Sequence, residues 1–166
     1  MAKGGVAMAN KFLLPVYKKV FGESFSYGRF EDRLKMQKMV YLLQEEGVNI
    51  GHYGFDWYKH GPYSQVLLDD MYMENGTACM GLNYTPEAEQ RIERLKEIFS
   101  DADAKEKYGV KNWTECLASI HFLRMKEMGS NASEEEILQV LTDRKPHLND
   151  DALNRKAYRL IENLAM

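Results

Sequence analysis

The sequence has little cysteine and no long hydrophobic run. Only two of its 166 residues are cysteine, Cys79 and Cys116, and they form no CxxC pair, so neither a zinc site nor a redox pair is expected. The longest apolar runs are far shorter than the roughly 18–20 residues that a membrane-spanning helix needs. Lys11, Lys18 and Lys19 interrupt the apolar stretches near the N-terminus, which argues against a signal peptide. These absences predict a cytoplasmic protein without membrane segments.

The sequence also lacks the motifs that mark common catalytic sites. It contains no HExxH metal motif, no GxSxG nucleophile motif and no glycine-rich phosphate loop. Its four histidines lack the spacing that would place two of them on one helix face. We therefore expect no cofactor, no metal and no catalytic residue. An enzyme that uses Ser64, His60 or Tyr63 in a cleft is the third of three hypotheses.

The composition that remains is that of an ordinary globular domain. Hydrophobic residues make up 45% and charged residues 28%, and the formal net charge is −3, which does not favour general binding to nucleic acid. The length suits a single domain over residues 1–166. Alternating charges and Gly109 make residues 100–111 a predicted loop and the best candidate for a boundary within that domain.

Hydrophobic periodicity predicts two helices at the start of the chain. Residues 6–21 have helical spacing, with a kink or break expected at Pro15 and an end at Gly22. Residues 29–46 show the clearest helical pattern, and Gly47 supplies the end.

Two short strands are predicted after these helices. Aromatic residues alternate with other residues over 53–59, which is typical of a strand. A second strand is predicted over 78–84. Between the two, we expect a helix with Pro62 in its first turn, where the missing N–H costs nothing.

The rest of the chain is predicted to be helical. Thr85 followed by Pro86 fits the start of a helix, and the apolar stretch 114–128 indicates a buried central helix. Ser133 begins a capping box, and apolar residues repeat at helical spacing over 153–164. The fold class is therefore mostly α with a small β-hairpin or wing (α+β), a winged-helix-like core with additional C-terminal helices.

The aromatic strand and the turn after it form the best candidate for a binding surface. Half of the alternating side chains should face the core, which leaves the others exposed beside cationic groups. Exposed aromatic residues next to a cation are typical of protein interfaces and of surfaces that stack bases, although an ordinary solvated strand face fits as well. The candidate interface residues are Tyr58, Lys59, His60, Gly61, Pro62, Tyr63 and Ser64.

Four basic residues on the predicted helix 29–46 are the candidates for contact with nucleic acid. Their spacing allows a stripe that contacts phosphates. Glu31 and Asp32 lie among them, so an ordinary solvated face is the simpler interpretation. The candidates are Arg29, Arg33, Lys35 and Lys38.

Two motifs resemble the YwgA-like and Panacea (SocA-like, phage-associated) families. In RLKMQKMVYLLQ the matching positions are Arg33, Leu34, Gln37, Lys38 and Tyr41, and in FDWYKHGPYSQVLLDDM they are Tyr58, Gly61, Pro62, Tyr63 and Ser64. The stretches LASIHFL and KPHLNDDALNRKAYRLIENL look like the C-terminal half of YwgA-like proteins. The similarity covers most of the chain after residue 25.

The resemblance implies a small helical domain with a winged-helix-like element. Panacea domains are antitoxin modules, and SocA-type members bind a toxin and present it to a protease. The leading hypothesis is therefore a non-enzymatic protein-interaction module, antitoxin-like or proteolytic-adaptor-like, whose partner is a toxin or a protease component. The alternative is a winged-helix DNA-binding regulator. The oligomeric state stays open.

Overall fold

The structure is a computed structural model that describes residues 10–75 and 82–164. These residues form a mostly helical fold with one two-stranded antiparallel sheet, as predicted. The elements are α1 (Leu13–Phe21), α2 (Phe30–Glu45), β1 (Asp56–Tyr58), β2 (Gly61–Tyr63), α3 (Gln65–Glu74), α4 (Pro86–Phe99), α5 (Ala102–Lys107), α6 (Gly109–Phe122), the π-helical turn η1 (Leu123–Glu127), α7 (Glu134–Arg144) and α8 (Asp151–Leu164).

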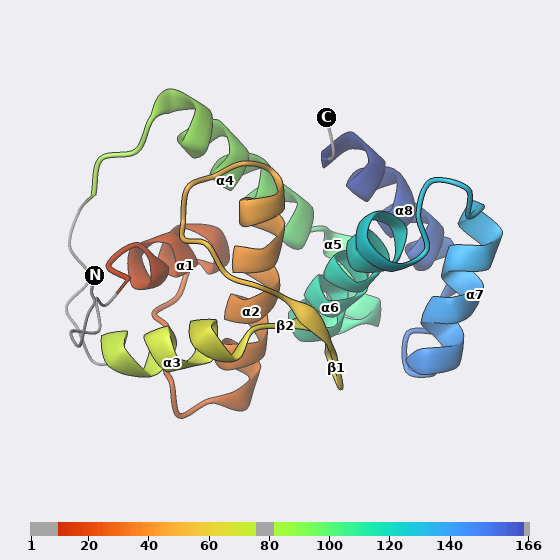
Figure 1. Cartoon of the computed structure of the whole chain (residues 1–166), viewed down its shortest axis with the longest axis horizontal. Coiled ribbons are helices and arrows are strands. Elements are labelled where there is room, and N and C mark those ends of the chain that lie inside the picture. The colour runs from red at the N-terminus through yellow and green to blue at the C-terminus, as the bar shows by residue number, and fades with distance from the viewer. Residues whose placement is uncertain (1–9, 76–81, 165–166) are drawn as a thin grey trace.

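Two helices, α2 and α6, organise the packing. Helices α1, α3 and α4 pack around α2, and α5, α7 and α8 pack around α6 (Figure 1). The two central helices also contact each other, and both contact β2. One cluster of buried side chains runs through both halves, so a single core holds the hairpin against the helices.

The first two helices largely follow the prediction. α1 ends at Gly22, whose φ of 76° gives the left-handed conformation of a helix end. The expected kink at Pro15 is wrong, because Pro15 is the third residue of α1 and backbone N–H groups in a first turn have no partner within the helix. Residues 6–9 of the predicted helix lie outside the described residues. α2 matches the helix predicted over 29–46.

The hairpin differs from the prediction in its second strand. β1 lies within the predicted strand 53–59, but it pairs with β2. Residues 78–81 of the other predicted strand lie outside the described residues, and residues 82–84 form no strand. In the observed register Trp57 lies opposite Pro62 and Tyr58 lies opposite Gly61.

Pro62 therefore lies in a strand and not in the first turn of α3. A two-stranded sheet has only edge strands, and an edge tolerates a residue that has no N–H to donate. The helix begins later because Ser64 caps it. Its hydroxyl oxygen accepts a hydrogen bond from the backbone N–H of Leu67 at 3.2 Å.

The segment predicted as a loop over 100–111 is largely helical. Asp101 caps α5 by accepting a hydrogen bond from the backbone N–H of Ala104 at 3.0 Å. Lys107 and Asp103 form an ion pair one turn apart, so the alternating charges belong to the exposed side of a short helix. Ala104 is buried in the common core, and the segment therefore joins the two halves through packed side chains.

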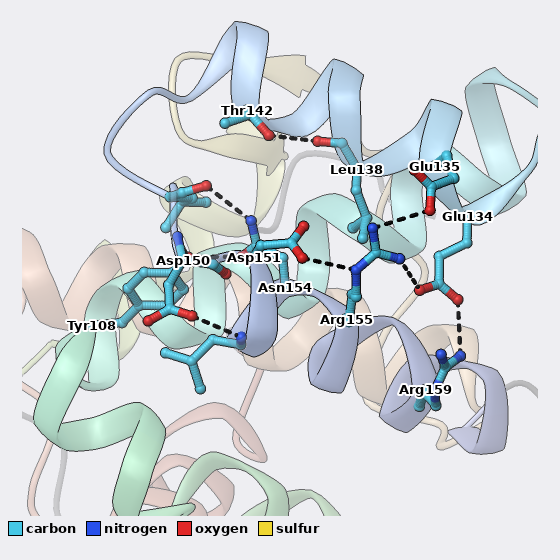
Figure 2. A network of polar contacts seen from close by, with 12 residues as sticks. Tyr108, Glu134, Glu135, Leu138, Thr142, Asp150, Asp151, Asn154, Arg155 and Arg159 are labelled. Carbon is cyan, nitrogen blue, oxygen red and sulfur yellow. Dashed lines mark hydrogen bonds and ion pairs between the residues drawn. The ribbon is translucent and has the colours of Figure 1, made fainter.

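The C-terminal helices confirm the predicted caps and pattern. Thr85 caps α4, and Ser133 and Glu136 form both hydrogen bonds of a capping box at the start of α7. α6 and η1 together cover residues 114–127 of the helix predicted over 114–128. On α8, Arg155 reaches Asp151 on its own helix and the first turn of α7, as Figure 2 shows.

Candidate functional site

The tip of the hairpin and the first half of α2 enclose a cavity of about 410 Å³, here called the hairpin pocket. Lys59 and His60 form the two-residue turn of the hairpin, and α2 forms the opposite wall. A pocket of this size is in the range that holds one or two large side chains of a ligand. Its lining residues are Phe30, Arg33, Leu34, Gln37, Lys38, Tyr58, Lys59, His60, Tyr63 and Leu68.

Aromatic side chains stand at the pocket while remaining open to solvent. Phe30 is 49% exposed and Tyr58 is 56% exposed, so both rings present apolar surface to solvent. The Phe30 ring meets the His60 ring edge to face at 5.3 Å, and the rings of Tyr58 and Tyr63 lie 5.1 Å apart. These contacts hold the turn in place and leave ring surface available for a ligand.

Basic side chains form part of the polar lining of the pocket, together with Gln37. Arg33 lies 5.7 Å from the centre of the Phe30 ring and donates a hydrogen bond to the carbonyl of Tyr27. Lys38 is only 1% exposed, and its Nζ donates to the carbonyl oxygen of Pro62 at 2.8 Å. Of the ten described residues that line the pocket, none is acidic.

Burial changes the protonation of two of these groups. It lowers the pKa of Lys38 to about 7, an effect that Glu115 opposes and Lys145 reinforces. Burial also lowers the pKa of His60, where Glu115 acts in the opposite direction. The neighbouring cations Lys145, Lys38 and Lys111 lower the pKa of His60 further. Both shifts favour the neutral forms of Lys38 and His60, so the formal positive charge of the pocket comes from Arg33 and Lys59.

A buried ion pair supports the hairpin from behind. Glu115 on α6 and Lys145 after α7 lie 3.0 Å apart, with side chains only 1% and 3% exposed. Lys145 also donates a hydrogen bond to the carbonyl oxygen of Lys59 at 2.6 Å. The turn is thus tied to a residue 86 positions further along the chain.

Two further contacts fix the second strand. The side-chain amide of Gln37 donates to the carbonyl of Ser64 and accepts from its N–H, both at 2.9 Å. Gly61 has a φ of 89° and packs against Ser119 on α6. With α2, α6 and Lys145 all holding it, the hairpin is a rigid wall of the pocket.

The structure divides the seven predicted interface residues into two groups. Tyr58, Lys59, His60 and Tyr63 line the hairpin pocket. The other three, Gly61, Pro62 and Ser64, are buried, and their role is to place the hairpin against α2 and α6. The hydroxyl of Ser64 caps α3 and is not in the pocket.

The four predicted contacts for nucleic acid do not form one exposed stripe. Arg29 is exposed but pairs with Asp32 at 3.1 Å. Lys35 is buried and lies 3.2 Å from Glu23. Arg33 and Lys38 line the hairpin pocket instead. The helix buries Lys35 and Lys38 because core contacts surround it on several sides.

Sequence reasoning missed three residues that matter at this site. Phe30 has the helical spacing of a core residue, yet it lies at the start of α2 and is half exposed at the pocket. The sequence offers one clue to Glu115 and its partner Lys145: Glu115 is a carboxylate within an otherwise largely apolar part of its helix. A charge in such a place generally has a buried partner.

Comparison of the chain with family models, with curated proteins and with solved structures finds no match. Within the described ranges, no three His, Cys, Asp or Glu side chains come together as metal ligands, and Cys79 lies outside those ranges. No helix between residues 10–75 or 82–164 has the length and apolar character to cross a membrane.

Proposed function

We propose that this chain is a non-enzymatic protein-interaction module, antitoxin-like or proteolytic-adaptor-like, that takes a segment of its partner into the hairpin pocket. One observation carries the proposal: Phe30 and Tyr58 expose about half of their side chains at a pocket with braced walls. Aromatic residues in preformed pockets supply much of the binding energy of protein interfaces. A rigid wall lowers the entropy cost of binding.

The family resemblance points in the same direction. The matching positions include Arg33 and Lys38 on α2 and Tyr58 and Tyr63 on the hairpin, and all four line the hairpin pocket. A toxin or a protease component is the partner that the resemblance implies. Two other matching positions support the same pocket, since Gln37 lines it and holds Ser64, and Gly61 places the hairpin against α6.

The DNA-binding alternative draws less support from the same geometry. It combines a winged-helix-like core, with the hairpin as the wing, and a basic stripe on α2. Lys35 and Lys38 are buried, and Arg29 shares its charge with Asp32. Sequence-independent binding to DNA depends on several exposed cations that contact phosphates, so this arrangement favours a protein partner.

The test is affinity capture from the source cells with matched variants. The double variant Phe30→Ala/Tyr58→Ala removes the exposed rings, and Met125→Ala removes a side chain of similar exposure on η1. We expect the wild type and Met125→Ala to retain a stoichiometric protein after nuclease treatment, and the double variant to lose it. Thermal unfolding of all three proteins checks that the fold is intact. A partner retained by the double variant, or recovery of nucleic acid alone, overturns the proposal.

A further inference from the structure

The charge of the hairpin pocket restricts what it can hold. Arg33, Lys38, Lys59 and His60 line it, and no acidic side chain is among its ten described lining residues. The whole chain carries a net charge of −3, so this concentration of positive groups is local. A ligand that brings negative charge to this place is favoured, and one that brings a cation is repelled.

The residues behind the pocket form a buried cluster of opposite charges. Glu115 is buried between cations, with Lys145 at 3.0 Å, and its charge also acts on Lys38. One carboxylate thus faces two buried amines. Burial lowers the pKa values of Lys38 and His60 and so favours their neutral forms, which leaves Arg33 and Lys59 as the cations of the pocket.

The exposed aromatic rings set a second requirement for the ligand. The Phe30 ring and the Tyr58 ring are half exposed, and the apolar side chains of Leu34 and Leu68 complete the lining. An aromatic or large apolar side chain fits this surface by burial of ring area. A carboxylate on a neighbouring residue of the ligand can pair with the cations beside this surface.

We infer that the occupant of the hairpin pocket is an acidic–aromatic peptide segment of the partner protein. Its aromatic or large apolar side chain packs against Phe30 and Tyr58, and its Asp or Glu carboxylate pairs with the cationic side formed by Arg33 and Lys59. This inference rests on the proposed function and adds the chemistry of the partner to it.

A peptide fits this site better than a nucleic acid does. A nucleic acid requires a row of exposed cations along its backbone, and here the cations are gathered in one cavity of about 410 Å³. The negative net charge of the chain repels a long polyanion such as DNA. A short acidic segment needs to contact only the positive groups at the pocket.

The inference is tested by selection from a random 12-residue peptide display library on the intact protein. The expected result is enrichment of peptides that combine Asp or Glu with Phe, Tyr, Trp or Leu. The best peptide is then synthesised with each acidic residue also changed to its amide. We expect the amide form to bind about tenfold more weakly, and higher salt to reduce the difference.

Matched charge reversals locate the acidic contact on the protein. Lys59→Glu reverses a charge in the pocket, and Lys18→Glu reverses the charge of an exposed lysine on α1. Binding of the acidic peptide should fall about tenfold or more with Lys59→Glu and stay within about twofold with Lys18→Glu. Neither lysine is buried, so both variants keep the fold.

The outcomes separate the two proposals. Neutral or basic peptides that bind and depend on Phe30 and Tyr58 overturn the acidic inference and leave the proposed function standing. The absence of any peptide that depends on these two residues counts against both. A DNA duplex that binds with a steep salt dependence and displaces the peptide overturns the inference in favour of nucleic acid.

Discussion

The hydroxyl oxygen of Ser119 lies where a side chain at residue 61 would need to be. A Cβ placed on Gly61 would come within 2.5 Å of it, far inside van der Waals contact. Gly61 also has a φ of 89°, a conformation that side chains rarely adopt. The hairpin therefore approaches α6 through a position that only glycine fits.

Gly61→Ala should destabilise the protein by roughly 2–4 kcal/mol, from backbone strain together with the clash. In a Ser119→Ala background the nearest remaining atom of residue 119 is its Cβ at 3.7 Å, so only the cost of the strained φ should remain, roughly 1–2 kcal/mol. Urea unfolding of the four proteins measures both costs. An equal cost in the two backgrounds contradicts the close packing of Gly61 on Ser119.

Ser119→Ala by itself is the control for that cycle. The Ser119 hydroxyl is buried and has no hydrogen-bond partner among the described residues. Its removal should leave stability unchanged or raise it by up to about 1 kcal/mol, because an unpaired buried hydroxyl carries a desolvation cost.

The features that sequence reasoning predicted well have local causes. Thr85 with Pro86 and Ser133 with Glu136 form helix starts from groups within four residues of each other. The end of α1 at Gly22 depends in the same way on the conformation of one residue. Such features form wherever the short motif occurs, so pattern and propensity are enough to find them.

The errors come from contacts between distant parts of the chain. Pro62 looked like the start of a helix, but Lys38 and the pairing with Trp57 hold it in a strand. The sequence predicted a binding surface on the hairpin and named Arg33 and Lys38 separately, but it did not predict that these groups share one pocket. Its opposite wall and the support from Lys145 depend on residues 24 to 86 positions away, which no local pattern reveals.

The buried pair of Glu115 and Lys145 should be costly to break from one side. Lys145→Met leaves the Glu115 carboxylate buried without the lysine that pairs with it, and we expect a loss of roughly 3–5 kcal/mol. The double variant Glu115→Leu/Lys145→Met should lose less than the sum of its single changes.

Lys107→Met is the matched control for this pair. It breaks an ion pair with Asp103 in which both side chains are about half exposed, and it should cost under about 1 kcal/mol. Chemical denaturation of the wild type and these variants measures each loss of unfolding free energy. Additive losses at Glu115 and Lys145 are inconsistent with a coupled buried pair.

His121 should make the stability depend on pH in the acid range. It is buried beside Tyr41, whose hydroxyl lies 2.8 Å from Nδ1, and burial lowers the pKa of His121 from 6.5 to about 4. Between these values the unfolded chain binds a proton that the folded protein does not. The contribution is therefore complete above pH 6.5 and is lost as pH falls toward 4, by roughly 3 kcal/mol in all.

His121→Gln isolates this effect from that of the other acid-titrating groups. The difference in unfolding free energy between the wild type and the variant should shrink as pH falls from 6.5 to 4, and should be constant above pH 7. Denaturation curves at half-unit pH steps provide the measurement. A difference that does not change with pH means that His121 is protonated equally in both states.

Asn154 should contribute more to stability than its neighbour Arg155, although Arg155 makes more ion pairs. Asn154 is 2% exposed, donates to the carbonyl of Leu148 at 3.0 Å and accepts from the Tyr108 hydroxyl at 2.7 Å (Figure 2). Asn154→Ala leaves these buried groups short of partners and should cost roughly 2–4 kcal/mol at any salt concentration.

Arg155→Ala loses contacts with Glu134, Glu135 and Asp151 at the surface, where water screens them, so its cost should be smaller and should shrink further in high salt. Urea unfolding at low and high salt compares the two variants, and a larger, salt-independent loss for Arg155→Ala contradicts this ranking.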